Sequence, residues 1–218
     1  MLLTTFFPIE LICPICGTEF ESQTVGSCGF ASKRTDFRPN YWGANPVYHF
    51  YHDCPTCGFC GSEQIYDIKI DNEEFIKHIE ELGPLDKASC EESLMYKIER
   101  AMHCLELMRD YNIMDINEFT LANNWINAYW WANDHEHQKR FGDIVLDYFE
   151  KADHQGQVPD SQKLDILYLR GEINRRIGNI DKANEFFDRV LELAHAFPDK
   201  HKILSLASQQ KTDPKEVL

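Results

Sequence analysis

The sequence predicts an α+β fold, with a small β-rich module over residues 1–70 followed by an all-α region over residues 71–218. Three observations indicate this division. Cysteine, glycine, proline and aromatic residues concentrate before Ile70, and the short stretches between them have strand-like patterns. After Ile70, apolar residues recur with helical spacing. We therefore expect a domain boundary near this residue.

Composition and charge limit the classes of function. Of 218 residues 43% are hydrophobic, which is typical of a globular chain, and no apolar run approaches the roughly 18 residues that span a bilayer. The opening stretch lacks a basic region and a cleavage site, so we expect a cytoplasmic protein without a membrane partner. The net charge of −14 disfavours nucleic acid, because such binding requires a basic patch and only "SKRTDFR" gathers cations.

In the N-terminal module, "TEFESQTV" and "PVYHFYHD" predict strands joined by turns. The second stretch places His49 and His52 on opposite faces of a strand that leads into Cys54. Between the first and second cysteine pairs lie charged, aromatic and imidazole groups: Arg34, Asp36, Arg38, Tyr41, Trp42, His49, His52 and Asp53. Their spacings assemble no set of nucleophile, base and orienting group, so we expect structural roles, with Asp36 capping a turn or pairing with an arginine.

Helix signals follow one another after Ile70. "DNEEFIKHIEEL" opens with Asp71 and Glu74 at capping-box spacing and ends before Gly83. The next helix repeats the signature with Ser89 and Glu92, and its apolar face comprises Leu94, Ile98, Ala101, Leu105 and Met108. Further helices are expected over residues 117–133, 135–152, 161–177 and 181–196, and then, after Pro198, a short helix and a frayed tail.

One helix pair carries a repeat signature. In "LYLRGEINRRIGNIDKANEFFDRVLELAHAFP", Gly171, Ala183 and Phe187 fall where a tetratricopeptide repeat places its small and large packing residues. Small residues let two antiparallel helices approach, and a large residue one turn later fills the groove between them. The sequence therefore predicts tetratricopeptide-like hairpins, and an ordinary helical hairpin is the alternative.

A duplicated cysteine motif is the most specific signal in the chain. "CPICG" supplies Cys13 and Cys16, and "CPTCG" supplies Cys54 and Cys57. In each, proline fixes the first turn position and glycine permits a positive φ after the second cysteine, which makes a metal-binding knuckle. Two knuckles give four thiolates, the ligand set of a closed structural zinc site. The sequence predicts zinc bound by these four residues in a zinc-ribbon-like module.

Three alternatives to this interpretation stay open. Paired knuckles also bind iron in rubredoxin, because both metals accept tetrahedral sulfur. A Cys-x-x-Cys pair can perform thiol exchange, although such a pair is expected before a helix, and here each lies among strands. Cys28 or Cys60 could replace a ligand or help to bind an iron–sulfur cluster, but we favour unligated thiols; Cys90 and Cys104 are interpreted as helix-packing residues.

A second cluster lies in "WWANDHEHQKR". His135 and His137 diverge on a helix because they are two residues apart, so we expect a solvated helix start with Asp134 as its N-cap. The aromatic residues beside it, Trp125, Tyr129, Trp130 and Trp131, are expected to pack in the core, and a peptide-binding groove wall is the alternative.

The order of these elements resembles a known family. "CPICGTEFES", then "RTDFRPNYWGANPVYHFYHDCPTCGF", then an all-helical remainder is similar to the bacterial domain of unknown function 2225. The resemblance implies a zinc-ribbon-like front, tetratricopeptide-like helices and no established activity. We predict a non-catalytic scaffold that binds a protein or peptide partner, with zinc contributing to folding. The alternatives are an iron or thiol redox protein and a nucleic-acid-binding zinc ribbon.

Overall fold

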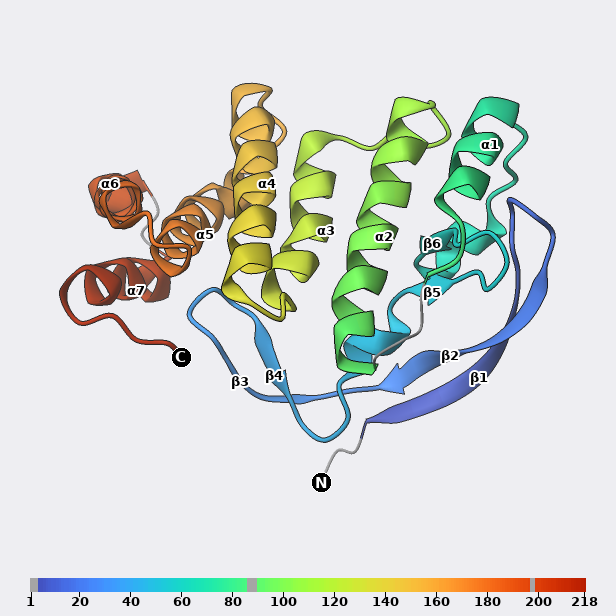
Figure 1. The fold of residues 1–218 in the computed structure, drawn as a ribbon. Coiled ribbons are helices and arrows are strands. Elements are labelled where there is room, and N and C mark those ends of the chain that lie inside the picture. The colour runs from blue at the N-terminus through green and yellow to red at the C-terminus, as the bar shows by residue number, and fades with distance from the viewer. Residues whose placement is uncertain (1–3, 86–89, 197–198) are drawn as a thin grey trace. The chain divides into compact units, whose positions relative to one another are not determined.

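The computed structural model describes residues 4–85, 90–196 and 199–218, and it is a mixed α+β structure as predicted (Figure 1). These residues form seven α-helices and three two-stranded sheets, and the sheets all precede Ser62. Unit 1 comprises Met1–Gly29, Tyr41–Ile116 and Trp131–Asn133, and unit 2 comprises Phe30–Asn40, Asn117–Trp130 and Asp134–Leu218. The domain boundary expected near Ile70 means that the parts before and after it fold independently. Contacts within the folded chain do not test independent folding, so this boundary stays a prediction.

Two β-hairpins organise unit 1. Strand β1 (Thr5–Ile12) pairs antiparallel with β2 (Glu19–Ser27), which confirms the strand predicted from "TEFESQTV". Strand β5 (His52–Asp53) pairs antiparallel with β6 (Cys60–Gly61). The two hairpin loops are residues 13–18 and 54–59, so each cysteine motif lies in the loop of a hairpin.

The strand predicted from "PVYHFYHD" is wrong for most of its length. Pro46–His49 form a 3-10 helix, and only His52 and Asp53 of this stretch lie in a strand. The Asn45 side chain accepts a hydrogen bond from Val47 N at 3.1 Å, and Pro46 supplies the fixed φ of the first helical position. Local turn chemistry therefore overrides the alternating apolar pattern.

Unit 1 continues with a 3-10 helix (Glu63–Asp67), α1 (Glu73–Leu82) and α2 (Cys90–Asp110). The N-cap of α1 is Asn72, one residue after the predicted Asp71, because its side chain accepts from Phe75 N at 3.0 Å. Gly83 ends α1 with φ +65° as expected. Ser89 and the Glu92 side chain lie outside the described residues. The predicted apolar face of α2 is buried throughout.

Aromatic side chains link the second cysteine loop to these helices. Phe59, directly after the loop glycine, is fully buried, with ring centroids 5.5 Å from Tyr66 and 6.4 Å from Phe75 of α1. From α2, Arg100 Nη1 donates to Gly58 O at 3.1 Å and to Gly83 O at 2.7 Å. The loop is thus held by apolar burial and by capped carbonyl groups.

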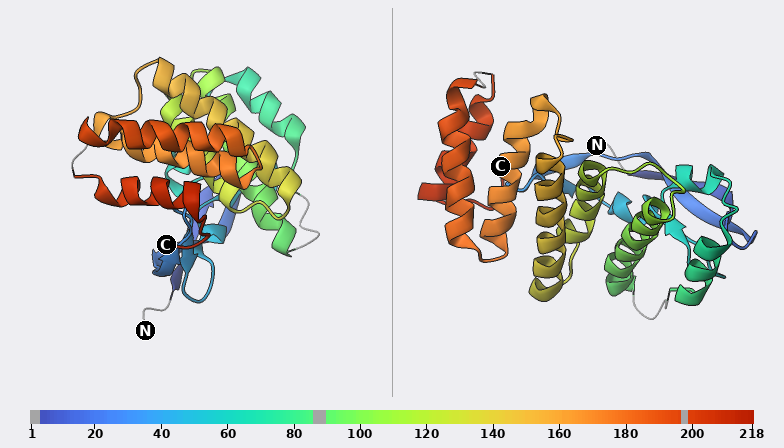
Figure 2. Two further views of the ribbon diagram at one scale, coloured as in Figure 1. Left: turned by 90° about the vertical axis from the view of Figure 1, so that its left-hand side faces the viewer. Right: turned by 90° about the horizontal axis from the view of Figure 1, so that it is seen from above.

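Unit 2 is mostly helical. Its helices are α3 (Glu118–Trp130), α4 (His135–His154), α5 (Lys163–Arg176), α6 (Ile180–Glu192) and α7 (His201–Thr212), with 3-10 turns at Asp160–Gln162 and Leu193–Ala196. Strand β3 (Phe30–Lys33) pairs with β4 (Pro39–Tyr41). Helices α5, α6 and α7 lie side by side (Figure 2). They share one core: Leu164, Leu167, Tyr168, Ala183, Phe187, Val190, Ile203, Leu206 and Ala207.

The α5–α6 hairpin contains the close contact that its sequence indicates. A Cβ atom at Gly171 would lie 2.7 Å from Phe187 Cε1, which is too close for any side chain. Ala183 and Phe187 are each 1% exposed. Glycine is therefore required where α5 crosses α6.

The predicted frayed tail is wrong, because the last residues pair with the segment after β3. Thr35 N donates to Glu216 O at 3.1 Å, Leu218 N donates to Lys33 O at 2.9 Å, and Arg34 and Val217 form an antiparallel bridge. The open backbone groups beside β3 give the tail partners that its polar sequence does not reveal. Pro198, expected before the final helix, lies outside the described residues.

Candidate metal centre

The four cysteines of the duplicated motif converge in unit 1. Their sulfur atoms all lie within 4.8 Å of one another, with Cys13 Sγ 3.6 Å from Cys57 Sγ and Cys16 Sγ 3.6 Å from Cys54 Sγ. A metal with four sulfurs at about 2.3 Å in a tetrahedron separates the sulfurs by about 3.8 Å. The observed spacing therefore fits a metal ion, and it fits zinc and iron equally because both bind thiolates tetrahedrally.

The two loops repeat the same backbone geometry. Gly17 N donates to Cys13 O at 2.9 Å and Cys13 N to Thr18 O at 2.9 Å, and Gly58 N donates to Cys54 O at 3.0 Å and Cys54 N to Phe59 O at 2.8 Å. Both glycines have the positive φ expected from the sequence, +69° and +74°. At Gly58 a Cβ atom would also overlap the carbonyl oxygen of Gly83, so a larger residue is excluded here by its side chain as well as by the positive φ.

Backbone amides point at the sulfurs, which favours the thiolate form. Cys13 Sγ accepts from the amides of Ile15 and Cys16, and Cys54 Sγ accepts from those of Thr56 and Cys57. The hydrogen bond from Cys57 Sγ lowers the pKa of Cys13 to about 5 and raises the pKa of Cys57. Sulfurs this close cannot all ionise without a cation, so a bound metal ion would take the place of the thiol protons.

Most of the sulfur group is shielded from water. Cys13, Cys54 and Cys57 are at most 4% exposed, and Cys16 is partly buried. Four protein sulfurs at these distances complete a tetrahedral shell, so no ligand position is left for a substrate. The arrangement suits a structural centre and not a catalytic one.

Two threonines join the loops beside the sulfurs, and the sequence interpretation missed both. Cys16 Sγ donates to Thr18 Oγ1 at 3.1 Å, and Thr18 Oγ1 donates to Thr56 Oγ1 at 3.0 Å. Thr18 follows the first knuckle and Thr56 lies inside the second. Their signal in the sequence is weak, because a hydroxyl residue beside a cysteine is common in turns.

His52 lies behind the group without joining it. Its ring is 1% exposed, its Nδ1 lies 2.8 Å from Ser22 Oγ, and Tyr66 Oη donates to its carbonyl oxygen at 2.6 Å. Burial, followed by the nearby Lys97 charge, lowers the pKa of His52 to about 4, so the ring is neutral. His49, in the 3-10 helix, packs its ring 4.3 Å from that of Phe6.

The remaining described cysteines have other surroundings. Cys60 is fully buried; its Sγ donates to Lys97 O at 3.4 Å, and its amide donates to Cys104 Sγ at 3.5 Å. Burial raises the pKa of Cys104 to about 11, which keeps this thiol protonated. Cys28 is exposed. None of the three belongs to the group of four sulfurs, and the Cys90 side chain lies outside the described residues.

The charged residues between the knuckles are used in packing. Asp36 is fully buried and accepts from Arg34 Nε at 3.0 Å and from Arg34 Nη2, which confirms the predicted pairing with an arginine. Arg38 Nη1 donates to Trp130 O at 3.0 Å, and Trp130 Nε1 donates to Asp36 O at 3.1 Å. Both arginines are thus engaged within unit 2, and the stretch "SKRTDFR" is not a free basic patch. In unit 1, Asp53 pairs with Lys97 at 3.0 Å.

The second candidate cluster is a helix start, as expected. Asp134 caps α4, its Oδ1 accepting from His137 N at 2.8 Å and its Oδ2 lying 2.6 Å from His137 Nδ1. Trp125 and Tyr129 are fully buried, which confirms core packing for these two, and Trp130 and Trp131 are partly buried.

Comparison with known proteins identifies a family. Residues 6–213 match the model of a family described as an uncharacterised protein conserved in bacteria, DUF2225. No curated protein and no solved structure matches the chain. Within the described residues, no helix has the length and apolar character needed to cross a membrane. Because the match covers nearly the whole sequence, the chain belongs to the DUF2225 family.

Proposed function

We propose that this protein is a non-catalytic scaffold, in which four cysteines bind a structural zinc ion and the helical part binds a protein or peptide partner. The observation that carries the proposal is the convergence of Cys13, Cys16, Cys54 and Cys57 within 4.8 Å. The cysteine hairpins then form a zinc-ribbon-like module. Zinc binding contributes folding free energy, because the unfolded chain has no preformed site.

Burial supports a structural role over redox exchange. An exchanging cysteine needs an accessible thiolate that can reach a second disulfide. Here Cys13, Cys54 and Cys57 are at most 4% exposed. An iron centre transferring electrons is compatible with the same sulfur positions, so the identity of the metal is the first thing to measure.

Helix packing supports the scaffold. The close contact of Gly171 with Phe187 and the burial of Ala183 are the features of one tetratricopeptide-like hairpin, and α3 pairs with α4 as another helical hairpin. Stacked hairpins present surfaces that bind other chains without catalysis. The ion pair of Arg34 with Asp36 and the hydrogen bond of Arg38 to Trp130 O argue against nucleic acid, since both cations already have partners within the chain.

The metal is tested by elemental analysis with an absorption spectrum of the untagged protein. We expect one zinc per chain and no visible absorption. Cys54→Ser should lose the metal, and Cys28→Ser, an exposed thiol outside the group, should retain it. Iron with visible absorption would replace this proposal with an electron-transfer centre.

The scaffold is tested by crosslinking in a bacterial lysate followed by mass spectrometry. We expect crosslinks from helices of unit 2 to one recurrent protein, reduced by substitutions of exposed helix residues and unchanged in Cys28→Ser. Retardation of oligonucleotides at low salt, where electrostatic binding is strongest, would favour a nucleic-acid role instead.

A further inference from the structure

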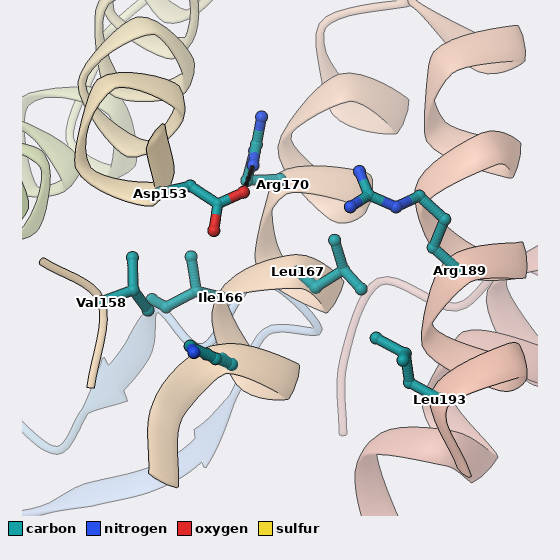
Figure 3. A pocket seen from close by; sticks show the side chains of 8 residues that line it. Asp153, Val158, Ile166, Leu167, Arg170, Arg189 and Leu193 are labelled. Atoms are coloured by element: carbon teal, nitrogen blue, oxygen red, sulfur yellow. Dashed lines mark hydrogen bonds and ion pairs between the residues drawn. The ribbon is translucent and has the colours of Figure 1, made fainter. Parts of the chain in front are cut away.

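A small pocket in unit 2 combines cations with an aliphatic floor. It is lined by α5, α6 and the segments beside them, and its volume is about 110 Å³ (Figure 3). Its aliphatic side chains are Val158, Ile166, Leu167 and Leu193. Its charged side chains are Asp153, Lys163, Arg170 and Arg189. Lys163 is paired with Asp160 at 2.7 Å, so the pocket presents two guanidinium groups, those of Arg170 and Arg189, to the one lining carboxylate of Asp153.

Arg170 is incompletely satisfied in this pocket. Arg170 is only 8% exposed. Its Nη1 lies 3.4 Å from Asp153 Oδ2, and its Nε has no hydrogen-bond partner among the described residues. A single contact at 3.4 Å is long for a charge-assisted hydrogen bond, which is normally about 2.7–2.9 Å. A buried guanidinium with an unmade hydrogen bond favours binding of a further acceptor.

A second guanidinium lies beside the first. Arg170 Cζ is 4.6 Å and Arg189 Cζ 6.0 Å from the centroid of the same Phe186 ring. Burial lowers the pKa of Arg170, the charges of Asp153 and Glu150 oppose this shift, and the neighbouring charge of Arg189 lowers the pKa further. Arg189 makes no ion pair with any described residue. Two like charges held on one ring are stabilised by an anion between them.

Two other arginines of α5, Arg175 and Arg176, each hydrogen-bond two carboxylate groups, unlike Arg170. One turn further along α5, Arg175 donates to both Glu172 oxygens at 2.9 Å and to Glu216 Oε1 at 2.8 Å. Arg176 donates to Glu172 Oε1 at 2.8 Å and to Glu216. There the second carboxylate comes from an extended segment in which aliphatic residues, Val217 and Leu218, follow the glutamate. At Arg170 and Arg189 the equivalent carboxylate is not supplied by the described chain.

We propose that this pocket binds an acidic side chain of an extended peptide segment in a partner protein, with the aliphatic side chain two residues later, on the same face of the segment, against Leu167 and Leu193. This proposal rests on the scaffold function and names its recognition site. The carboxylate would lie between the guanidinium groups of Arg170 and Arg189, and Asp153 would hold Arg170 in place.

The size and lining of the pocket favour this occupant over other anions. A cavity needs about 10–15 Å³ per water, so 110 Å³ accommodates several waters or one side chain, and ligand pockets of about 300–1,000 Å³ are much larger. A free phosphate gains nothing from four aliphatic walls, because its hydration is lost without apolar burial in return. A peptide gains from both halves of the site.

The test uses the full, metal-loaded chain and fluorescein-labelled hexapeptide pools in fluorescence anisotropy. One pool has Glu fixed at position 3 and Leu, Ile or Val at position 5, and the other positions are mixed. Matched pools replace the Glu by Gln, or the aliphatic residue by Ser. We expect the first pool to bind about tenfold or more tightly than either matched pool, since each loses one half of the contact.

Variants place that binding in the pocket. Arg189 is exposed, so the variant Arg189→Gln should fold normally. We expect this variant to bind the first pool about tenfold or more weakly than the unmodified chain does. Lys202→Gln, with the same change of charge on an exposed position of α7 outside the pocket, should leave binding of the first pool unchanged. Thermal unfolding followed by circular dichroism checks that both variants fold.

Three results would overturn the proposal: no pool binds, the two variants weaken binding equally, or inorganic phosphate at matched ionic strength displaces the first pool. Failure of the pocket is distinguishable from failure of the scaffold. If Arg189→Gln still crosslinks to the recurrent partner found with the unmodified chain, the scaffold function stands and another surface carries the recognition. If the pool binds but no partner crosslinks, the pocket stands and the cellular scaffold role does not.

Discussion

The sulfur group of unit 1 (Cys13, Cys16, Cys54 and Cys57) and the carboxylate group of unit 2 (Asp36, Glu172 and Glu216) differ in how their negative charge is balanced. Each gathers acidic groups away from water: four cysteine thiols, three of them buried, in unit 1, and the carboxylates of Asp36 and Glu172, both fully buried, in unit 2. In unit 2 the charge is balanced by the chain's own guanidiniums, those of Arg34, Arg175 and Arg176. In unit 1 no described cation lies within the sulfur group, and we propose that a metal ion supplies the balance. The carboxylate group is balanced whenever unit 2 is folded, because its arginines belong to the same chain. The balance of the sulfur group depends on whether a metal ion is bound.

The largest expected effect is that metal removal affects unit 1 selectively. Treating the protein with a chelator should expose the amides of β1, β2 and residues 54–59 to hydrogen exchange, while the amides of α5 and α6 stay protected. The reason is that structural zinc in small domains contributes about 10–16 kcal/mol of apparent binding free energy to folding. Hydrogen exchange followed by mass spectrometry measures both regions in one experiment. Equal loss of protection in α5 and α6 would contradict the contrast between the two groups.

The second prediction breaks the carboxylate group. Glu172→Gln keeps the shape of the side chain but removes the charge that Arg175 and Arg176 share. Breaking a buried ion pair from one side costs about 3–5 kcal/mol, and because Glu216 still pairs with both arginines we expect the lower end of this range. Urea unfolding monitored by helix signal should show this loss. Glu185→Gln, on an exposed position of α6, is the matched control and should change stability by less than about 0.5 kcal/mol.

The two groups also differ in how far the sequence predicts them. The four metal ligands could be identified because spacing, proline and glycine define each knuckle within five consecutive residues. The pairing of Asp36 with Arg34 is equally local and was predicted. The pairing of Arg176 with Glu216 and Asp36 could not be, since these residues are distant in sequence and only tertiary packing brings them together. Glu172 and Arg176, in contrast, are an i,i+4 pair within α5.

Errors in the fold have the same origin. Helices were predicted well, because caps and the 3.6-residue period are encoded locally. The strand expected over "PVYHFYHD" fails because Asn45 and Pro46 begin a 3-10 turn that the alternation of apolar residues does not reveal. The tail expected to fray is ordered by pairing with Lys33 and Thr35, which lie far away in the sequence. Long-range pairing is what the sequence patterns leave open.

A third prediction sharpens the packing beside the carboxylate group. Gly171→Ala should destabilise unit 2 by about 1–3 kcal/mol, because the new methyl group meets the Phe187 ring at 2.7 Å and overpacks the hairpin. The double variant Gly171→Ala with Phe187→Leu should recover part of the loss, since the smaller side chain makes room. Urea unfolding of Gly171→Ala, Phe187→Leu and the double variant gives the three losses of unfolding free energy. If the loss in the double variant equals or exceeds the sum of the two single losses, the methyl–ring contact is not the cause.

The smallest expected effect concerns Glu216, the exposed member of the carboxylate group. Burial opposes ionisation, but the hydrogen bond from Arg175 and the charges of Arg176 and Arg175 outweigh it and lower the pKa of Glu216 below its ordinary value. A carboxyl group whose pKa is lowered by folding stabilises the protein above the unfolded pKa, near 4.3, and this contribution is lost as the pH falls through the folded pKa. Because the side chain is 62% exposed, screening limits the contribution to less than about 1 kcal/mol.

Carbon-13 NMR of the glutamate carboxyls measures this difference directly. Glu216 should titrate below the ordinary range of a glutamate, and Arg175→Gln should move it back toward that range. The stability difference between the unmodified chain and Glu216→Gln should be present at neutral pH and disappear in acid. If instead Glu216 titrates in the ordinary range of a glutamate while Leu218 N stays bonded to Lys33 O, backbone pairing alone orders the tail, and the carboxylate group of unit 2 ends at its buried members.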